Sequence, residues 1–358
     1  MENPKDNPKD NQFLRNCWYL AHAGCGLKKG AMVGKTLLGE PVVIGRREDG
    51  GVFCLRDICP HRGIPLHYGH LQGCELQCCY HGWKFDTRNG ACVDIPSRPP
   101  DDTALRVDAI KVKSYPCREV QGNVWVYMPG EGYTEAAPLP EVPRIPHFAD
   151  DARPQVFETM HFPCNVDHAV MGLMDPAHAS YVHTSWWWRT RNLKLREVRK
   201  DYEPLPFGFR MVRYELKQSA KPYRILGDNV STEISFHLPS VRIEHITGDR
   251  HTVVSLTCCT PLNAKESEVH QFLYWTTPVL TLFKPVARAL LHRFLRQDRE
   301  VVVMQEEGLN YNPPIMFIND TDTQAKWYFS LKREWEKSQQ ERRPFNNPVK
   351  AKTLRWMS

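Results

Sequence analysis

The sequence predicts an α+β protein of two domains, each built on antiparallel strands. Between Trp18 and Tyr127, apolar residues fall in short alternating runs broken by Gly and Pro, such as Glu40 to Arg46, a pattern typical of a small β domain. Longer alternating stretches and then helix-like segments fill the second half of the chain. We therefore expect the second domain to hold one antiparallel sheet with a face covered by helices.

The composition leaves room for a core in both domains. The chain has 358 residues, of which 41% are hydrophobic, and this excludes a disordered protein. No apolar run reaches the roughly 18 residues that would span a bilayer, and the first dozen residues resemble no signal peptide, so we expect a cytoplasmic protein. The 12 cysteines do not fit a short secreted disulfide scaffold and indicate metal binding, catalysis or core.

The charge is concentrated at the end of the chain. The formal net charge is +6, and residues 332–358 hold eight Lys or Arg against three Glu. The remainder is nearly neutral, which argues against a nucleic-acid-binding protein. We expect the basic end to be a solvated segment, with a docking surface for a partner as the alternative.

Domain boundaries follow from the changes in pattern. Residues 1–12, with a tandem NPKD repeat, are expected to be a disordered leader. The first domain is expected at 13–130, a proline-rich linker at 131–155, the second domain at 156–340 and a basic tail at 341–358.

The second domain is expected to begin with a helical segment from Cys164 to His183. Alternating stretches then predict strands, and the apolar periodicity after them predicts helices. The expected strands are Leu193–Tyr202, Phe207–Lys217, Thr232–Ile246, His251–Thr260 and Ser267–Trp275, and the expected helices are Leu280–Leu295, Gln297–Leu309 and one from near Asp320 to Glu336. Thr321 and Gln324 have the spacing of a capping box at the start of the last helix.

Two short loops each combine a cysteine with a histidine. Cys59-Pro-His61 is followed, after 16 intervening residues, by Cys78-Cys-Tyr-His81-Gly-Trp. Two such loops can hold a metal cluster between them, because thiolate and imidazole bind both iron and zinc. A zinc site is the alternative, but zinc fingers usually pair Cys with Cys and His with His along the chain.

The two loops resemble those of the Rieske domain, and the resemblance extends over roughly Trp18 to Tyr127. It implies a [2Fe–2S] cluster whose ligands are Cys59, His61, Cys78 and His81. Cys79 is a rival to Cys78, but only Cys78 gives the Cys-x-x-His spacing. The region around Gly90 and Pro96 looks like the loop that covers the cluster in that family.

A second candidate site lies in Asp175-Pro-Ala-His178-Ala-Ser-Tyr-Val-His183. Two imidazoles and a carboxylate on one face of a ferrous ion leave positions open for O₂ and substrate. Five residues of ideal helix turn through about 500°, which would place the two histidines about 140° apart. We therefore expect a helix end or a π-type bulge between them. His161 and His168 are expected to be ordinary core or surface residues.

The spacing of these two histidines resembles the iron motif of Rieske oxygenase catalytic domains. In that family the third ligand is a carboxylate on a late helix, and Gln297 to Val303 is similar to that segment in the vanillate and dicamba demethylase group. The resemblance implies a mononuclear Fe(II) held by His178, His183 and Asp298. Glu300, Glu306 and Glu307 are rivals for the carboxylate.

Asp175 is not an iron ligand in the family pattern. It resembles the carboxylate that hydrogen-bonds a catalytic-iron histidine on one side and a Rieske histidine of the adjacent subunit on the other, which implies a homotrimer. Gly172 departs from the pattern, because related monooxygenases often have Asn at this position.

The resemblance implies a Rieske-type monooxygenase component that uses O₂ and electrons from an NADH-dependent reductase or ferredoxin. No dinucleotide motif is visible in the sequence, so these partners are expected to be separate proteins. The expected reaction is hydroxylation or oxidative demethylation of a hydrophobic ring compound, aromatic or steroid- or terpenoid-like. A ring-cis-dihydroxylating dioxygenase and a Rieske electron-transfer protein without catalytic iron are the alternatives.

Bulky apolar residues near the second site predict a substrate pocket. Trp186, Trp187 and Trp188 follow the second histidine, and Leu173 and Met174 precede the first. The helix expected at Leu280 to Leu295 is a further candidate wall. The alternative is that the whole cluster is ordinary core.

Overall fold

The computed structural model describes residues 13–99, 101, 105–130, 133–134, 138–183, 196–216 and 225–357. The chain divides into two compact units. One consists of Arg15–Arg144 with Phe148–Arg153, and the other of Pro154 onward with Ile145–His147. The expected leader at residues 1–12 and the three consecutive tryptophans lie outside the described residues.

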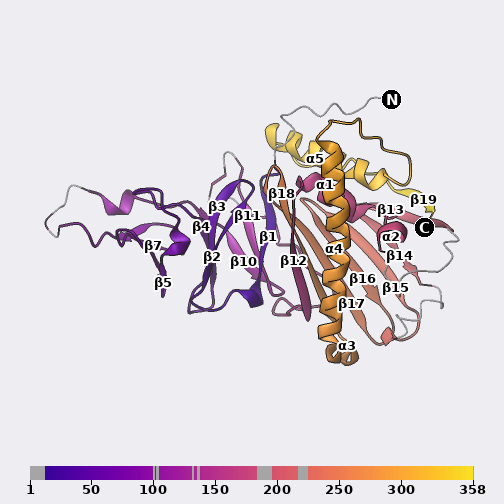
Figure 1. The fold of residues 1–358 in the computed structure, drawn as a ribbon, viewed down its shortest axis with the longest axis horizontal. Helices are drawn as coiled ribbons and strands as arrows, with labels where there is room; N and C mark the ends of the chain where they lie inside the picture. The colour runs from indigo at the N-terminus through magenta and orange to yellow at the C-terminus, as the bar shows by residue number, and fades with distance from the viewer. Residues whose placement is uncertain are drawn as a thin grey trace. The chain divides into compact units, whose positions relative to one another are not determined.

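The first unit is built from short antiparallel strands (Figure 1). In the described residues they form three sheets, with the strand orders β1-β11-β10, β2-β3-β4-β9 and β5-β6-β7-β8. The strands are β1 Cys17–Ala23, β2 Met32–Leu37, β3 Glu40–Arg46, β4 Val52–Arg56, β5 His70–Gln72, β6 Glu75–Gln77, β7 Lys84–Asp86, β8 Cys92–Asp94, β9 Ser114–Tyr115, β10 Cys117–Val120 and β11 Asn123–Met128. Single 3₁₀ turns at Gly24–Gly26, Leu66–Tyr68 and Val107–Ala109 connect them.

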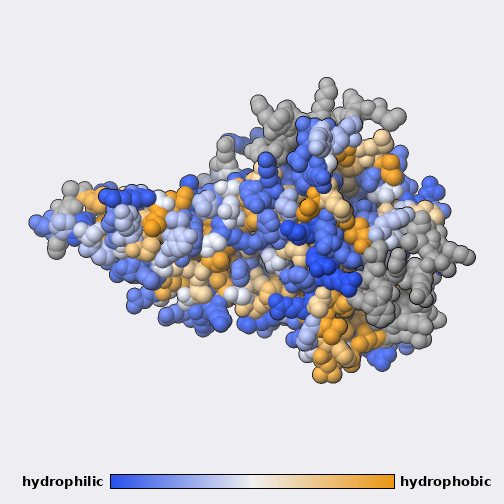
Figure 2. All heavy atoms as spheres, in the orientation of Figure 1, coloured by the Kyte–Doolittle hydropathy of each residue, from blue (hydrophilic) through white to orange (hydrophobic). Residues whose placement is uncertain are grey.

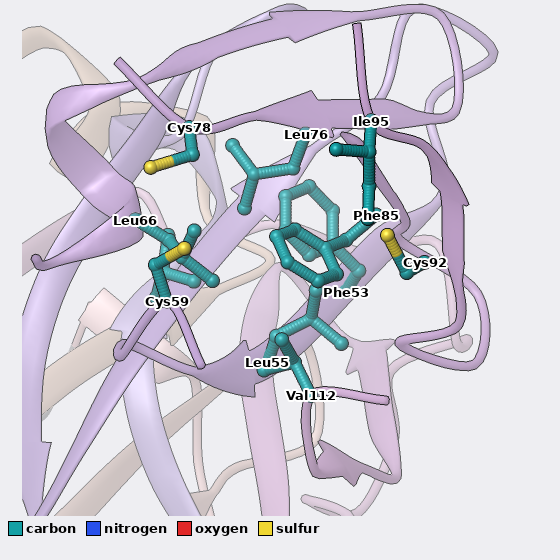
Figure 3. Packing of buried hydrophobic residues seen from close by; sticks show 11 residues of the cluster. Phe53, Leu55, Cys59, Leu66, Leu76, Cys78, Phe85, Cys92, Ile95 and Val112 are labelled. Carbon is teal, nitrogen blue, oxygen red and sulfur yellow. The ribbon is translucent and has the colours of Figure 1, made fainter. Parts of the chain in front are cut away.

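One apolar cluster of this unit lies beneath the two cysteine loops (Figure 3). Leu55, Leu66, Leu76 and Phe85 are fully buried in it. The small four-stranded sheet β5-β6-β7-β8 has little area of its own, so this shared cluster anchors it. The loops that carry the cysteines are therefore attached to a rigid base.

The second unit is one antiparallel sheet of eight strands with helices across it (Figure 1). Its strand order is β12-β18-β17-β16-β15-β14-β13-β19. The strands are β12 Val156–Phe162, β13 Glu197–Leu205, β14 Gly208–Glu215, β15 Ser231–His237, β16 Val241–Thr247, β17 Thr252–Asn263, β18 Glu266–Trp275 and β19 Lys352–Met357. The helices are α1 Val166–Met174, α2 Ala179–Val182, α3 Pro278–Leu282, α4 Lys284–Leu309 and α5 Thr323–Gln340. This matches the predicted fold class.

The strand expected over Thr232–Ile246 is two strands, β15 and β16. They pair antiparallel, with His237 opposite Val241, and a tight turn containing Pro239 joins them. The apolar positions alternate up to Leu238 and resume at Val241, so the alternation changes phase by one residue at the turn. This change of phase and Pro239 were the available signals, because proline is disfavoured inside a central strand.

The prediction of two helices, at Leu280–Leu295 and Gln297–Leu309, is wrong. The structure instead has the short α3 and then one continuous 26-residue helix, α4. Pro285 lies in the first turn of α4, where proline is tolerated. The two expected helices are separated only by Arg296, which does not interrupt the backbone hydrogen bonds of a helix. Asp298 consequently lies in the middle of a long helix that packs along β12 (Figure 1).

The capping box expected at the start of the last helix does not form. The N-cap of α5 is Asp322, which makes no side-chain cap, and its carboxylate accepts the Ile318 N–H at 2.8 Å instead. The Gln324 amide donates to the Tyr202 hydroxyl at 3.1 Å, so this side chain ties α5 to the sheet rather than to its own helix end.

The end of the basic tail is part of the sheet, in contrast to the solvated segment expected. β19 pairs with β13 at the sheet edge, and Leu354 at its centre is fully buried. A basic composition therefore concealed a strand whose alternate residues face inward. Among the described helices, none combines the length and the apolar character needed to cross a membrane.

Candidate metal centres

The two cysteine loops share one backbone design. In each, the glycine four residues after the cysteine donates its N–H to the cysteine carbonyl, Gly63 to Cys59 at 2.9 Å and Gly82 to Cys78 at 3.1 Å. Both glycines have φ near +75°, a conformation that disfavours residues with a Cβ. Each cysteine N–H in turn donates a hydrogen bond to the carbonyl of the residue after the glycine. The loops are therefore matched turns that present one thiol each.

The two thiols face each other from buried positions. Cys59 and Cys78 are 2% and 3% exposed, and their sulfur atoms lie on the same side of the apolar cluster (Figure 3). Cys79, in contrast, is exposed. Burial raises the pKa of the Cys59 thiol to about 11, against the effect of the backbone N–H groups of His61 and Arg62. A buried thiolate pair here requires a compensating cation, as bound iron would supply.

The two histidines of the loops lie beside each other. The ring centroids of His61 and His81 are 4.4 Å apart, and His61 stacks on Trp83 at 4.9 Å with an interplanar angle of 7°. Desolvation, and then the neighbouring His61 and Arg62, lower the pKa of His81, which favours the neutral imidazole that binds metals. Pro96 lies against Gly82, so the region expected to cover the cluster packs beside the second loop.

The second centre begins where helix α1 ends. Asp175 is the C-cap of α1, and the chain then forms α2, a single turn with His178 at its N-cap and His183 at its C-cap. The backbone of His183 is no longer helical, with φ −85° and ψ 69°. The helix end that the five-residue spacing requires is thus present, and both rings can turn toward one point.

Asp298 reaches the same point from α4. Its Oδ1 lies 3.6 Å from His178 Nε2 and 3.3 Å from His183 Nε2. Ligand atoms of the three residues lie within 4.8 Å of one another. Two imidazoles and a carboxylate on one face are the donor set of mononuclear Fe(II) sites.

The rival carboxylates have other positions. Glu306 pairs with His168 Nδ1 at 2.6 Å, and Glu300 pairs with Arg296 at 3.3 Å. Glu307 is exposed on α4. Of the four acidic residues of α4, only Asp298 lies beside the two histidines in the described structure. His161, expected to be ordinary, pairs with Glu266 near the surface.

The hydrogen bonds of the two rings leave their Nε2 atoms free for a metal. His178 Nδ1 donates to the Asp175 carbonyl at 2.6 Å, and His183 Nδ1 donates to Gln297 Oε1 at 3.3 Å. A neutral imidazole that donates from Nδ1 carries its lone pair on Nε2. The Nε2 of His183 is buried and has no hydrogen-bond partner among the described residues, which is the condition of a ligand atom.

The pKa shifts of the two histidines run in opposite directions. Burial lowers the pKa of His183, and the charge of Asp298 offsets only part of this effect. Burial also lowers the pKa of His178, but the nearby carboxylates of Asp298 and Asp175 outweigh it and the net pKa is raised. The Asp298 carboxylate raises the pKa of both rings, and the net shifts differ because burial prevails only at His183.

Two residues of this centre were not expected from the sequence. Gln297 accepts from His183, and Phe294 stacks on the same ring with centroids 3.8 Å apart. Phe294 is four residues before Asp298 and so shares its helix face. This spacing could have predicted from the sequence that Phe294 lies at the centre. Gln297 has no comparable signal, since it becomes important only after the loop and the helix meet.

A network of charges holds α1 in place. Asp167 accepts from Lys332 Nζ at 2.8 Å and from the Tyr328 hydroxyl at 2.6 Å, both on α5. The side chain of Lys332 is only 11% exposed, so this pair is largely shielded from solvent. Because α1 leads into the two histidines, its attachment to α5 and α4 fixes where their loop starts.

The carboxylate of Asp175 shapes the turn between α1 and α2. Its Oδ1 accepts the Ala177 N–H at 2.7 Å, and its Oδ2 lies 4.0 Å from His178 Nδ1, beyond hydrogen-bond distance. The main-chain carbonyl of the same residue takes the His178 proton instead. The carboxylate is 35% exposed and therefore accessible from outside the chain.

A cavity of about 760 Å³ opens onto the three ligand residues. Leu173 and Met174 line it as expected, and so does Leu295 from α4. Leu280 instead packs against Val156 and Trp275. A cavity of this size accommodates a ring system of several rings.

Comparison with known proteins identifies the type of the first domain. Residues 17–116 match the Rieske [2Fe-2S] domain. The chain is 38% identical over 178 residues to chlorophyllide a oxygenase of Chlamydomonas reinhardtii, covering 48% of this chain and 25% of that protein. It is 37% identical over 174 residues to the oxygenase component of dicamba O-demethylase from Stenotrophomonas maltophilia, covering 48% of each. These matches thus span from a quarter to about half of the length of the curated relatives.

Solved structures extend the similarity to nearly the whole chain. Dicamba monooxygenase bound to 3,6-dichlorosalicylic acid superposes with a TM-score of 0.71 at 25% identity, covering 92% of this chain and 99% of that one. Residues 17–116 therefore form a Rieske [2Fe–2S] domain, and the chain as a whole resembles dicamba monooxygenase in fold.

Proposed function

We propose that the chain is the terminal oxygenase component of a Rieske-type monooxygenase. It takes electrons from a separate NADH-dependent reductase or ferredoxin and uses O₂ to hydroxylate or oxidatively demethylate a hydrophobic ring compound. The observation that carries the proposal is the convergence of His178, His183 and Asp298 on the wall of a large cavity. A Rieske electron carrier would need neither the three ligands nor the cavity.

The residues of the chain have separate tasks in this proposal. The matched loops would hold a [2Fe–2S] cluster by Cys59, His61, Cys78 and His81, and the second centre would hold Fe(II). When bound, the cluster supplies electron transfer and the ferrous ion supplies O₂ activation for insertion into a C–H bond. Gln297 and the Asp175 carbonyl orient the two imidazoles, and Phe294 covers the His183 ring on one side.

We further propose that Asp175 joins two copies of the chain. Its exposed carboxylate can accept an N–H from His81 of a second copy, which would place the two kinds of centre in adjacent subunits of a homotrimer. Val279, Leu282 and Phe283, at and beside α3, form an exposed apolar patch (Figure 2), and such a patch commonly marks a surface that a subunit interface or a partner covers.

Product analysis tests the proposal. The purified iron-loaded chain, a surrogate reductase, NADH and O₂ are incubated with methoxyaromatic, N-methyl and sterol compounds, and products are analysed by mass spectrometry. We expect at least one compound to gain one oxygen atom or to lose one methyl group with release of formaldehyde. Asp298→Ala is the control. The reductase should still reduce the cluster of this variant, but no product should form. Reduction of the cluster without any product from the wild type would contradict an oxygenase function.

A further inference from the structure

The cavity has two chemically different walls. The helix side carries the three ligand residues among apolar side chains such as Leu173 and Phe294. The sheet side carries a row of polar side chains from three neighbouring strands. These are Arg242 of β16, Thr257 of β17 and Gln271 of β18, and all three line the cavity.

The three polar residues are adjacent by register. Arg242 lies opposite Thr257, and Thr257 lies opposite Gln271 in the antiparallel ladder. Side chains directly opposite each other have Cβ atoms about 4.5–5.5 Å apart. The row therefore presents its polar groups to one point of a bound molecule.

Two polar atoms of this row are without a partner among the described residues. Thr257 is 1% exposed and its hydroxyl makes no hydrogen bond, and the Oε1 of Gln271 makes none either. The other amide atom of Gln271 donates to Ser255 Oγ at 3.2 Å. Buried polar groups are nearly always paired in folded proteins, and an unpaired one is costly, so these two atoms indicate a ligand group.

We infer that Thr257 and Gln271 bind a hydroxyl group on the ring substrate and so determine which compounds the enzyme accepts. A hydroxyl donates one hydrogen bond and accepts others, which complements a carbonyl acceptor beside a threonine hydroxyl. It also complements Gln271 if the amide is turned around, because a hydroxyl then accepts from the NH₂ group. This inference rests on the proposed function for its link to catalysis, but the binding site stands on the cavity alone.

A carboxylate fits the row less well than a hydroxyl. Arg242 donates to Glu244 at 3.1 Å, so its positive charge is already paired within the cavity wall. An anion would meet the Glu244 carboxylate and the Gln271 carbonyl oxygen nearby. The row therefore selects a neutral oxygen group.

The polar row and the ligand residues face the same cavity. Thr257 and Cys259 line it from one face of β17, and His178, His183 and Asp298 line it from the helix side. A ring compound with a hydroxyl bound at Thr257 would therefore share one cavity with the three ligand residues.

Binding of matched fluorescent probes tests the inference without turnover. The iron-loaded chain is titrated anaerobically, without reductant, with pyrene, 1-hydroxypyrene and pyrene-1-carboxylate, and binding is followed by fluorescence anisotropy. We expect 1-hydroxypyrene to bind about tenfold more tightly than either other probe, as one or two net hydrogen bonds would give. Equal binding of pyrene and 1-hydroxypyrene, preference for the carboxylate, or no binding of any probe would overturn the inference.

Variants of the strand assign the preference to the row. Thr257→Val keeps the shape and should abolish the hydroxyl preference while changing pyrene affinity by less than about twofold. Thr257→Ser should retain the preference. Thr260→Val is the matched control, because Thr260 is buried on the same strand but does not line the cavity. A hydroxyl preference that survives in Thr257→Val overturns the inference. Selective binding of 1-hydroxypyrene by a wild type that shows no turnover supports the inference and contradicts the proposed function instead.

Discussion

The two candidate centres differ in how the chain builds them. The four residues proposed to hold the cluster lie between Cys59 and His81, in loops closed by their own backbone hydrogen bonds. The mononuclear site takes two residues from the ends of a one-turn helix and a third from α4, far along the chain. The first centre depends on local turns, whereas the second depends on packing between distant elements.

This difference has a consequence for mutation. A change within a cysteine loop removes a ligand from a fixed cradle and should leave the second centre intact. A change in α1, α4 or their contacts can move a ligand of the second centre without touching it. Substitutions in the cysteine loops and in the helices should therefore differ in which centre they affect.

The largest effect is expected at the cluster loops. Cys78→Ser removes a buried thiol that faces Cys59, so the Rieske visible and EPR signals should disappear. Cys79→Ser is the matched control, and it should keep both signals because the Cys79 side chain is exposed. The reverse pattern would show that Cys79 is the ligand.

A substitution at Asp175 should slow turnover without removing iron. Asp175→Asn retains an oxygen that can accept the Ala177 N–H but loses the charge, so the bridge proposed between subunits should fail. We expect turnover to fall by about 100-fold, at the upper end of what loss of a ligand-orienting partner costs, with the cluster still reducible. Asp228→Asn, an exposed acid of the same unit, is the control. Unchanged single turnover in Asp175→Asn would rule out the bridge.

Gln297 should affect only the second centre, and less strongly. Gln297→Ala removes the acceptor that orients His183, so the affinity of this site for ferrous iron should fall about tenfold. Competition with a chelator measures this affinity, and the cluster EPR signal serves as an internal reference. Gln305→Ala changes the same residue type two turns along α4 and should have no effect. Equal chelator sensitivity of both variants would contradict the orienting role.

The smallest effect is expected at Gly172. A Cβ at this position meets nothing within 4 Å, so Gly172→Ala should fit and raise the unfolding free energy by about 0.5–1 kcal/mol through reduced backbone entropy. Thermal unfolding measures the change. Gly208→Ala is the opposite case, because its Cβ would lie 1.8 Å from the Phe236 carbonyl oxygen and should destabilise the sheet. A lower melting temperature for Gly172→Ala would show that this part of α1 is more tightly packed.

Sequence patterns predicted the strands of the second domain better than their connections. Alternation identifies a strand because one face is buried, but the turn at Pro239 shifts the phase of the alternation by only one residue, so two strands resemble one long strand. Composition misled at the C-terminus, since the charged Lys352 and Arg355 are exposed while Leu354 between them is buried.

The site residues show the same limit. Leu291, Leu295 and Val302 form the buried stripe of α4, and Asp298 falls within that periodicity, so a carboxylate stands where an apolar residue is expected. That signal favours Asp298 over its rivals from the sequence alone. The partnership of Gln297 with His183 has no counterpart in the pattern, because it arises only when α2 packs against α4.

Metal analysis of the wild type and Asp298→Ala decides whether one chain holds two separate iron centres. Iron and acid-labile sulfide are measured per chain after anaerobic reconstitution, together with the Rieske EPR signal. We predict about three irons and two sulfides for the wild type, and about two irons and two sulfides with an unchanged EPR signal for the variant. A wild type with only about two irons, or a variant that retains the third, would contradict the account.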